Sequence, residues 1–220
     1  MKRKLFLLTA ILLSFSLFLT ACGQTKKDVV LAVGEEKGKA AGLALINQVF
    51  DTSETEASVE YQTRVANRLR DGTTGKEVLL EPDRVYVVKT APKKGETDSY
   101  YAEVDAVTGN AYYAARAVSG IILTKDQQKQ ADALKPLDMA DLNSFLDTQN
   151  EAVKIVDTFV RDRLEKDVPI LRTFPDMIET DSADFPKLFL EYFVIMQGGK
   201  VYNLTLCWPT MDLVRVYIRD

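Results

Sequence analysis

The sequence predicts an α+β protein made of two tandem units, in each of which a helix packs on an antiparallel sheet of three to four strands. Three observations lead to this prediction. Apolar residues recur at helical spacing in two separate stretches, strand-like runs follow each stretch, and turn sequences separate these runs. The units are expected at residues 34–120 and 148–220, with a helical connector over 121–147. A single α+β domain without a repeat is the alternative.

Composition excludes several kinds of chemistry. The 220 residues include 28 Lys plus Arg, 32 Asp plus Glu, no His and two Cys, and 46% are hydrophobic, which is typical of a globular chain. Without His there is no imidazole base, and two Cys cannot form a cysteine zinc site. We therefore expect no enzyme activity, no metal and no cofactor.

The N-terminal residues have the pattern of an export signal. Residues 1–4 are basic, and residues 5–20 are apolar apart from Thr and Ser, which is fewer than the roughly 20 residues that span a bilayer. Residues 19–22, Leu-Thr-Ala-Cys, resemble the lipobox of bacterial lipoproteins. The resemblance implies cleavage before Cys22 and a lipid on Cys22. It also implies an extracytoplasmic protein at the outer face of the cell membrane, or at the outer membrane where a cell has two.

Several expectations follow from this signal. Residues 1–21 are predicted to be a signal peptide and residues 22–33 a tether. Removal of three basic residues and no acidic one changes the net charge from −4 to −7, so we expect no nucleic-acid binding. The expected partners are a membrane, through the lipid on Cys22, and a protein of the cell envelope. Cys207 then has no disulfide partner, and its place in an apolar run predicts a small buried hydrophobe.

The first unit should begin with a helix. Leu43, Ile46 and Phe50 recur at helical spacing over residues 35–50, although Gly38 and Gly42 weaken the first turns. A half-buried strand is expected at residues 59–65, then a loop at 71–75, and three further strands at 84–90, 99–105 and 111–118.

The connector and the second unit follow from capping and alternation. Thr124 with Gln127, and Thr148 with Glu151, predict capping boxes that open helices. The first helix is short and ends at Pro136, a second is expected at 138–146, and the third is longer, with apolar residues on one face from Val153 to Leu164. The chain is expected to be irregular from Pro169 to Asp184, and strands are expected at 188–197, 201–208 and 213–219.

Residues 101–109, Tyr-Ala-Glu-Val-Asp-Ala-Val-Thr-Gly, resemble the final hairpin of the PepSY domain, a small α+β module. In that family a strand ends in Asp, Thr-Gly follows at the turn, and an Ala-rich helix lies upstream, as residues 40–44 do here. The resemblance covers about residues 35–118, and the second unit lacks the motif and is at best a diverged copy. PepSY modules occur in protease propeptides and envelope lipoproteins, so the resemblance implies a binding or regulatory module that acts on an envelope protease.

Asp105, Thr108 and Gly109 are interpreted as a structural turn. An Asp at a strand end accepts backbone N–H bonds, and Gly supplies a positive φ. The sheet face turned away from the helix is the candidate partner-binding surface. Tyr and Arg are enriched at interfaces, but they are also ordinary residues of a solvated sheet, and both readings stay open. The candidate face residues are Arg64, Tyr101, Glu103, Tyr112 and Arg116.

Alternation assigns further residues to the two faces. Tyr61, Val65, Tyr100 and Tyr113 are expected to face the helix of the first unit, and Val214 and Val216 that of the second. The outward residues of the second unit are Asn203, Thr205, Arg215, Tyr217 and Arg219.

The sequence thus favours a lipid-anchored binding or regulatory module of the cell envelope. Two alternatives stay open: a small-ligand-binding or structural envelope lipoprotein and, less favoured, a carboxylate-dependent cell-wall hydrolase. Residues 29–40 mimic a P-loop, but its glycines are one residue too close and Ala40 replaces the Ser or Thr that holds magnesium. The acidic residues from Asp176 to Asp184 lack the spacing of a calcium loop and are more typical of a solvated segment.

Overall fold

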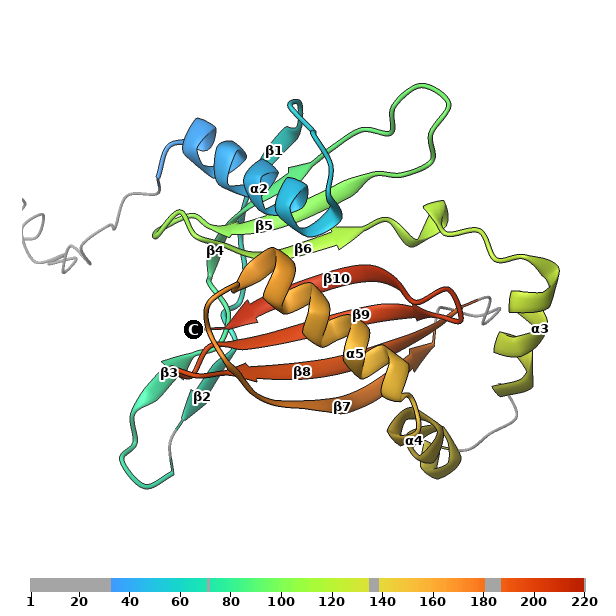
Figure 1. Cartoon of the computed structure of the whole chain (residues 1–220). Helices are drawn as coiled ribbons and strands as arrows, with labels where there is room; N and C mark the ends of the chain where they lie inside the picture. Colours follow the sequence, from blue (N-terminus) through green and yellow to red (C-terminus); the bar gives the residue numbers. More distant parts are fainter. Residues whose placement is uncertain (1–32, 71, 135–138, 181–186, 220) are drawn as a thin grey trace, which may run out of the picture. The chain divides into compact units, whose positions relative to one another are not determined.

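The computed structural model describes residues 33–70, 72–134, 139–180 and 187–219, which belong to one compact unit, Ala32–Asp220. The fold is α+β, and within the described residues it has four α-helices and an eight-stranded antiparallel sheet (Figure 1). The predicted signal peptide and nearly all of the predicted tether lie outside the described residues. None of the helices described is long and apolar enough to cross a bilayer.

Helix α2 (Glu35–Phe50) is confirmed where the spacing predicts it. Its two internal glycines face the sheet at very short range. A Cβ atom added to Gly38 would lie 2.6 Å from Cδ2 of Tyr86, and one added to Gly42 would lie 2.6 Å from Cγ2 of Val88. The glycines that weaken the helix in isolation therefore allow it to pack closely on strand β4 (Arg84–Lys89).

The strands of the first half form an antiparallel meander under α2. These strands are β1 (Ser58–Thr63), β4, β5 (Tyr100–Asp105) and β6 (Ala111–Arg116). The chain between β1 and β4 carries a separate hairpin, β2 (Arg68–Arg70) and β3 (Glu77–Leu79), on either side of the loop expected at 71–75. The sequence patterns do not predict these two strands. The prediction that Val65 faces the helix is wrong, since Val65 lies beyond the end of β1 and is exposed.

The connector contains a short 3-10 turn, η1 (Val118–Gly120), and the helices α3 (Lys125–Leu134) and α4 (Met139–Asp147). The first capping box is confirmed: the backbone N–H of Thr124 donates to Oε1 of Gln127 at 2.9 Å, and that of Gln127 donates to Oγ1 of Thr124 at 3.3 Å. The second is wrong. The Thr148 hydroxyl donates to the backbone carbonyl of Phe145 at 2.7 Å instead, and helix α5 (Asn150–Phe159) begins after Gln149.

The second half places four strands after α5 and its π-helical continuation η2 (Val160–Leu164). Strands β8 (Leu188–Met196), β9 (Val201–Trp208) and β10 (Asp212–Arg219) match the predicted runs. The prediction of an irregular segment after Pro169 is wrong, because β7 (Ile170–Thr180) pairs with β8 along its length. Pro175 and two register shifts in β7 interrupt the alternation that normally marks a strand.

All eight strands belong to one sheet, in the order β1-β4-β5-β6-β10-β9-β8-β7 (Figure 1). Strands β6 and β10 pair antiparallel at its centre, with Tyr113 opposite Tyr217 and Ala114 opposite Val216. The two-unit arrangement is therefore not confirmed, because strands of both predicted units share a single sheet.

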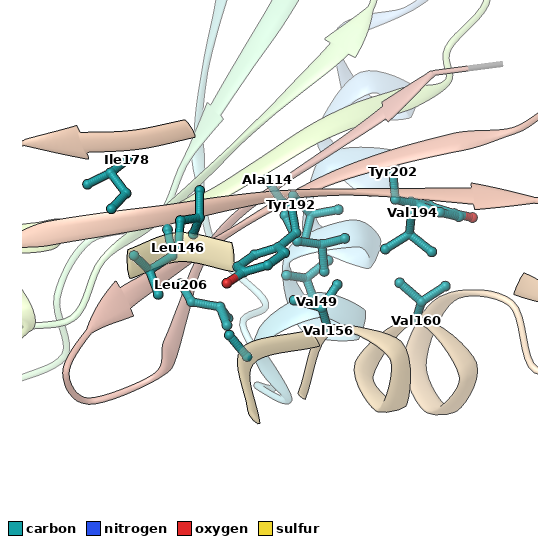
Figure 2. Close-up of a cluster of buried hydrophobic side chains, with 14 of the residues drawn as sticks. Val49, Ala114, Leu146, Val156, Val160, Ile178, Tyr192, Val194, Tyr202 and Leu206 are labelled. Carbon is teal, nitrogen blue, oxygen red and sulfur yellow. The ribbon is translucent and has the colours of Figure 1, made fainter. Parts of the chain in front are cut away.

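Helices α2 and α5 lie on the same face of this sheet and share one hydrophobic core. Figure 2 shows Val49 of α2 and Val156 of α5 against Ala114, Tyr192 and Val194 of the strands. All of these residues are buried. We call the opposite side of the sheet, which α2 and α5 leave uncovered, the open face.

The close approach of α2 to β4 leads to a stability prediction. Gly42→Ala should destabilise the protein by about 1–3 kcal/mol, since the new Cβ atom has to displace Val88 in a packed core. Elsewhere in a helix the same change usually stabilises. Gly34→Ala is the matched control, because nothing lies within 4 Å of a Cβ atom there and its φ is −60°. Urea unfolding followed by circular dichroism measures both, and equal stabilities would contradict the close approach.

Candidate functional site

Arg64, Glu103 and Tyr112 form a connected polar group on the open face. Nη1 and Nη2 of Arg64 donate to the two carboxylate oxygens of Glu103, each at 2.8 Å, and the Tyr112 hydroxyl donates to the same carboxylate at 2.6 Å. Hydrogen bonding to Glu103 raises the pKa of Arg64, so the guanidinium stays charged. A bidentate pair of this kind holds both side chains in a fixed orientation.

Tyr101 lies on the same face, and its partner there is Tyr113. Their hydroxyl oxygens are 2.9 Å apart. The register explains why Tyr113 is not on the helix side as predicted. Glu103 is opposite Tyr113 but Val104 is opposite Ala111, so Tyr112 is an extra residue and β6 has a bulge. A bulge turns consecutive side chains toward one face. The prediction for Tyr113 is therefore wrong, and both tyrosines lie on the open face.

Arg116 is separate from the other candidate face residues. It lies opposite Tyr100 in the β5–β6 ladder, and the Tyr100 ring is 4.9 Å from that of Phe50 in α2, so the register places Arg116 on the helix side. Its guanidinium donates to the carboxylate of Asp98 at 2.8 to 3.0 Å.

Tyr217 continues the aromatic group across the centre of the sheet. Its ring centroid is 5.6 Å from that of Tyr112 and 6.1 Å from that of Tyr113, both in edge-to-face geometry. Tyr101 and Tyr113 are in ring contact at 5.4 Å. The four tyrosines therefore form one aromatic row from β5 through β6 to β10. We call Tyr101, Tyr112, Tyr113 and Tyr217 the tyrosine row.

Arg215 forms the second polar group of the open face. Its Nε donates to Oγ1 of Thr205 at 2.8 Å, and its Nη2 contacts the carboxylates of Glu179 on β7 and Glu191 on β8. Burial raises the pKa of Glu191, the charge of Arg215 opposes this rise, and neighbouring Glu179 adds to it. Burial by itself lowers the pKa of Arg215, but the two carboxylates of Glu179 and Glu191 raise it by more, so the guanidinium stays charged. Arg215 is thus the cation that holds two carboxylates on the sheet.

Arg219 extends the face toward the last strands. Its guanidinium carbon is 4.9 Å from the ring centroid of Tyr217 and 6.0 Å from that of Phe193 on β8. A depression of about 420 Å³ lies between these residues and Arg215. It adjoins two further hollows that contain residues of the tyrosine row, so the open face is concave along several strands.

Two segments border the open face at opposite ends of β6 and β10. At one end, Ile121 from the chain after η1 packs on Phe189, Cys207 and Val214. At the other end, the backbone carbonyl of Leu80 accepts a hydrogen bond of 3.4 Å from the Tyr217 hydroxyl.

Val214 lies on the open side, because it packs with Ile121, Phe189 and Cys207. Its predicted inward position is therefore wrong. A register shift between Leu213 and Arg215 reverses its direction.

The turn after β5 is held by its own residues. The Asp105 carboxylate accepts the backbone N–H of Val107 at 2.7 Å and that of Thr108 at 3.4 Å, and the Thr108 hydroxyl accepts the N–H of Asn110 at 3.2 Å. Gly109 has a φ of +79°, a conformation that favours glycine. These contacts give the three residues a structural part in the hairpin.

The remaining candidates do not form a reactive centre in the described residues. Cys207 is fully buried, and burial raises the pKa of its thiol to about 11, so it stays protonated at neutral pH. Within the described ranges no group of three or more His, Cys, Asp and Glu side chains is placed to hold a metal ion. Asp176 and Glu179 lie on β7, whereas Cys22, Asp181 and Asp184 lie outside the described residues.

The open face is suited to binding. Burial raises the pKa values of Tyr112 and Tyr113, and their hydrogen bonds to Glu103 and Tyr101 add to this, so both phenols remain neutral. The acidic groups of the face are held by Arg64 and Arg215. The face thus offers aromatic rings, phenol hydroxyls and guanidinium groups in fixed positions.

Sequence reasoning missed several residues of this face. Glu179 and Phe193 lie on strands β7 and β8 of the second half, and nothing near them in sequence connects them to Tyr113. Glu191 carried a usable signal, since it is an acidic residue within the apolar run of residues 188–196. Such a residue usually has a charged partner.

Comparison of the chain with protein-family models, curated proteins and solved structures gives no match. The resemblance to the PepSY hairpin stays a prediction that rests on residues 101–109 and on the order of the elements.

The Arg215 cluster leads to a pH-dependent prediction. Because the folded-state pKa of Glu191 is raised, its contribution to stability is lost as pH rises through that pKa. In Arg215→Ala the buried carboxylate loses its cation, and its pKa rises further. At pH 7 we expect the variant to lose free energy of unfolding near the lower end of about 3–5 kcal/mol. Near pH 4, where Glu191 is protonated, the loss of free energy of unfolding should be smaller.

Thermal unfolding at both pH values measures this difference. The control is Arg116→Ala, which removes a pair with the partly exposed Asp98 and should cost about 1 kcal/mol or less. Equal losses for Arg215→Ala at pH 4 and pH 7 would contradict the buried ion cluster.

Proposed function

We propose that this protein is a lipid-anchored, extracytoplasmic binding module of the bacterial cell envelope, which binds a segment of a protein partner on its open sheet face. The observation that carries the proposal is the tyrosine row with Arg215 and Arg219 beside it on neighbouring strands. Tyr and Arg are the residues that most often dominate the energy of protein interfaces.

The rigidity of this surface supports the proposal. Its side chains stand on paired strands, and hydrogen bonds hold Tyr101 against Tyr113 and Tyr112 against Glu103. Side chains that are already ordered lose little conformational entropy when a partner binds. Arg219 lies over an aromatic ring, is exposed, and leaves a charged group available to an acidic or carbonyl-bearing segment.

The anchor part of the proposal rests on the N-terminal signal. Residues 19–22 supply the lipobox-like sequence, and Cys22 would carry the lipid. Gly23 and Gln24, and not Asp, stand directly after Cys22, so in a cell with two membranes the outer membrane is the expected site.

We also infer that the chain consists of two tandem α+β units joined edge to edge. A helix followed by four strands of the sheet occurs twice, as α2 with β1, β4, β5 and β6, and as α5 with β7 to β10. The last strands of the two sets pair with each other. Residues 34–120 would be the PepSY-like unit and residues 148–220 its diverged copy. Regulation of an envelope protease is what that resemblance implies for the partner.

The other function classes have less support. The carboxylates of Glu179 and Glu191 lie together, as a hydrolase would need, but both are held by Arg215. A guanidinium between two carboxylates occupies the place of the substrate or water in a glycosidase. A small-ligand site would be enclosed. The hollows that contain the tyrosine row are instead open depressions.

Cys22→Ser tests the anchor. The variant should be found in the soluble fraction or as an uncleaved precursor, because no thioether to lipid can form on Ser. Cell fractionation and the mass of the recovered chain measure this. Cys207→Ser is the control, since Cys207 is buried and should leave the fractionation unchanged. Membrane-bound, fully processed Cys22→Ser protein would contradict the anchor.

Site-specific photo-crosslinking tests the binding face. The photoreactive residue p-benzoylphenylalanine, introduced at Tyr217, should give a discrete protein adduct in living cells, since this ring contacts both Tyr112 and Tyr113 of the tyrosine row and lies beside Arg219. The same residue at Tyr61 is the control, because Tyr61 is exposed on edge strand β1 beside the helix-side residue Tyr86. Addition of Arg219→Ala should weaken the adduct at position 217. Identical adducts from both positions, or none from 217, would contradict the proposed face.

A further inference from the structure

The β2–β3 hairpin has one apolar and one charged side. Arg68 lies opposite Leu79 and Arg70 opposite Glu77 in its ladder, and the backbone N–H of Leu80 continues the ladder by donating to the carbonyl of Asn67 at 2.8 Å. Successive side chains of a strand point to opposite faces. Leu69 and Leu80 therefore share one face of the hairpin, and the charged residues Arg68, Arg70 and Glu77 share the other face with Leu79.

The hairpin segment is unusually rich in exposed apolar side chains. Val65 is 95% exposed, Leu69 59%, Leu79 52% and Leu80 47%. Half of the large exposed hydrophobic residues of the described chain thus lie within residues 65–80. A two-stranded hairpin is only marginally stable in water by itself, and clustered exposed apolar residues mark a surface that contacts another phase or molecule.

The position of the hairpin indicates what its exposed apolar side chains contact. Leu79 and Leu80 border the same hollow as Thr108 and Asn110, which belong to the turn after β5. The incoming chain is bound at that end too, since the backbone N–H of Val33 donates to the carbonyl of Ala106 at 2.7 Å. The 12 residues from Cys22 to Val33 span at most about 40 Å when fully extended. A lipid on Cys22 would therefore keep the membrane within reach of the hairpin.

We propose that the β2–β3 hairpin contacts the lipid surface that carries the anchor, with Leu69 and Leu80 at the boundary of the acyl chains. This inference rests on the proposed lipidation of Cys22. Arg68 and Arg70, on the other side of the hairpin, have long apolar stems that allow their guanidinium groups to reach phosphate headgroups. Two contacts of this kind, one covalent and one through the hairpin, fix one end of the sheet at the membrane more firmly than the tether alone.

Quenching by brominated lipids tests the contact. The chain from Cys22 to Asp220 is coupled through Cys22 to a maleimide lipid in vesicles of phosphatidylcholine and phosphatidylglycerol, with buried Cys207 left unreacted. Tryptophan is placed on the hairpin by Leu69→Trp, or at the opposite end of β6 by Ile122→Trp, where Ile122 is 78% exposed. The unsubstituted chain gives the background of Trp208. Brominated acyl chains should reduce the emission at position 69 about twofold or more and leave position 122 nearly unchanged.

The outcomes separate this inference from the anchor. Equal quenching at positions 69 and 122, or none at 69, would overturn the contact. Adding Leu80→Glu to Leu69→Trp should reduce the quenching, and unchanged quenching would also overturn it. If circular dichroism shows that Leu69→Trp does not fold, Val65→Trp is read in the same way. The mass of the chain isolated from cells shows separately whether Cys22 carries a lipid, and this coupling does not depend on that result.

Discussion

The pairing of β6 with β10 is the interaction on which the rest of the structure depends. It sets Ala114 opposite Val216 on the helix side and Tyr113 opposite Tyr217 on the open side. Ala114 lies in the same hydrophobic cluster as Leu45 and Val49 of α2 and Val156 of α5, so both helices share one core beside this ladder. The same ladder brings the tyrosines of the first half to the arginines of the second. Without it there would be two narrow sheets and no continuous face.

Irregularities in the ladders decide which side chains the open face presents. The bulge in β6 turns Tyr112 and Tyr113 to the same side, and the shift in β10 turns Val214 toward Phe189. Each irregularity adds one residue and reverses the alternation beyond it. The face therefore carries more aromatic surface than regular strands would allow. Polar groups that are buried on this face need charged or hydrogen-bonding partners. Arg64 is the partner of Glu103, and Arg215 is the partner of Glu191.

The helix side of the sheet provides the packed core, and the open side provides the proposed binding surface. The helix side contains the fully buried residues Tyr192, Val194 and Leu204, and its packing is so close that α2 needs Gly38 and Gly42 against β4. Among the described residues, the segment after η1 and the hairpin segment before β4 border the open side at its two ends. In the proposed arrangement the hairpin end lies at the membrane, and the tyrosine row between the two ends receives the partner.

The sequence by itself determined the α+β class, helix α2, strands β4 to β6 and β8 to β10, and the capping box at Thr124, because periodicity and capping are local properties. Alternation placed Tyr101 and Glu103 on one face because it holds within the regular strand β5. Arg64 and Tyr112 were assigned to the same face, but Arg64 lies beyond the end of β1 and Tyr112 is turned to that face by the bulge in β6. Only the tertiary structure decided that both halves share one sheet, that Tyr113 and Val214 face the open side, and that Glu179 and Glu191 meet Arg215. These depend on ladder register and on strands far apart in the chain, and single-residue bulges alter register without leaving a periodic signal.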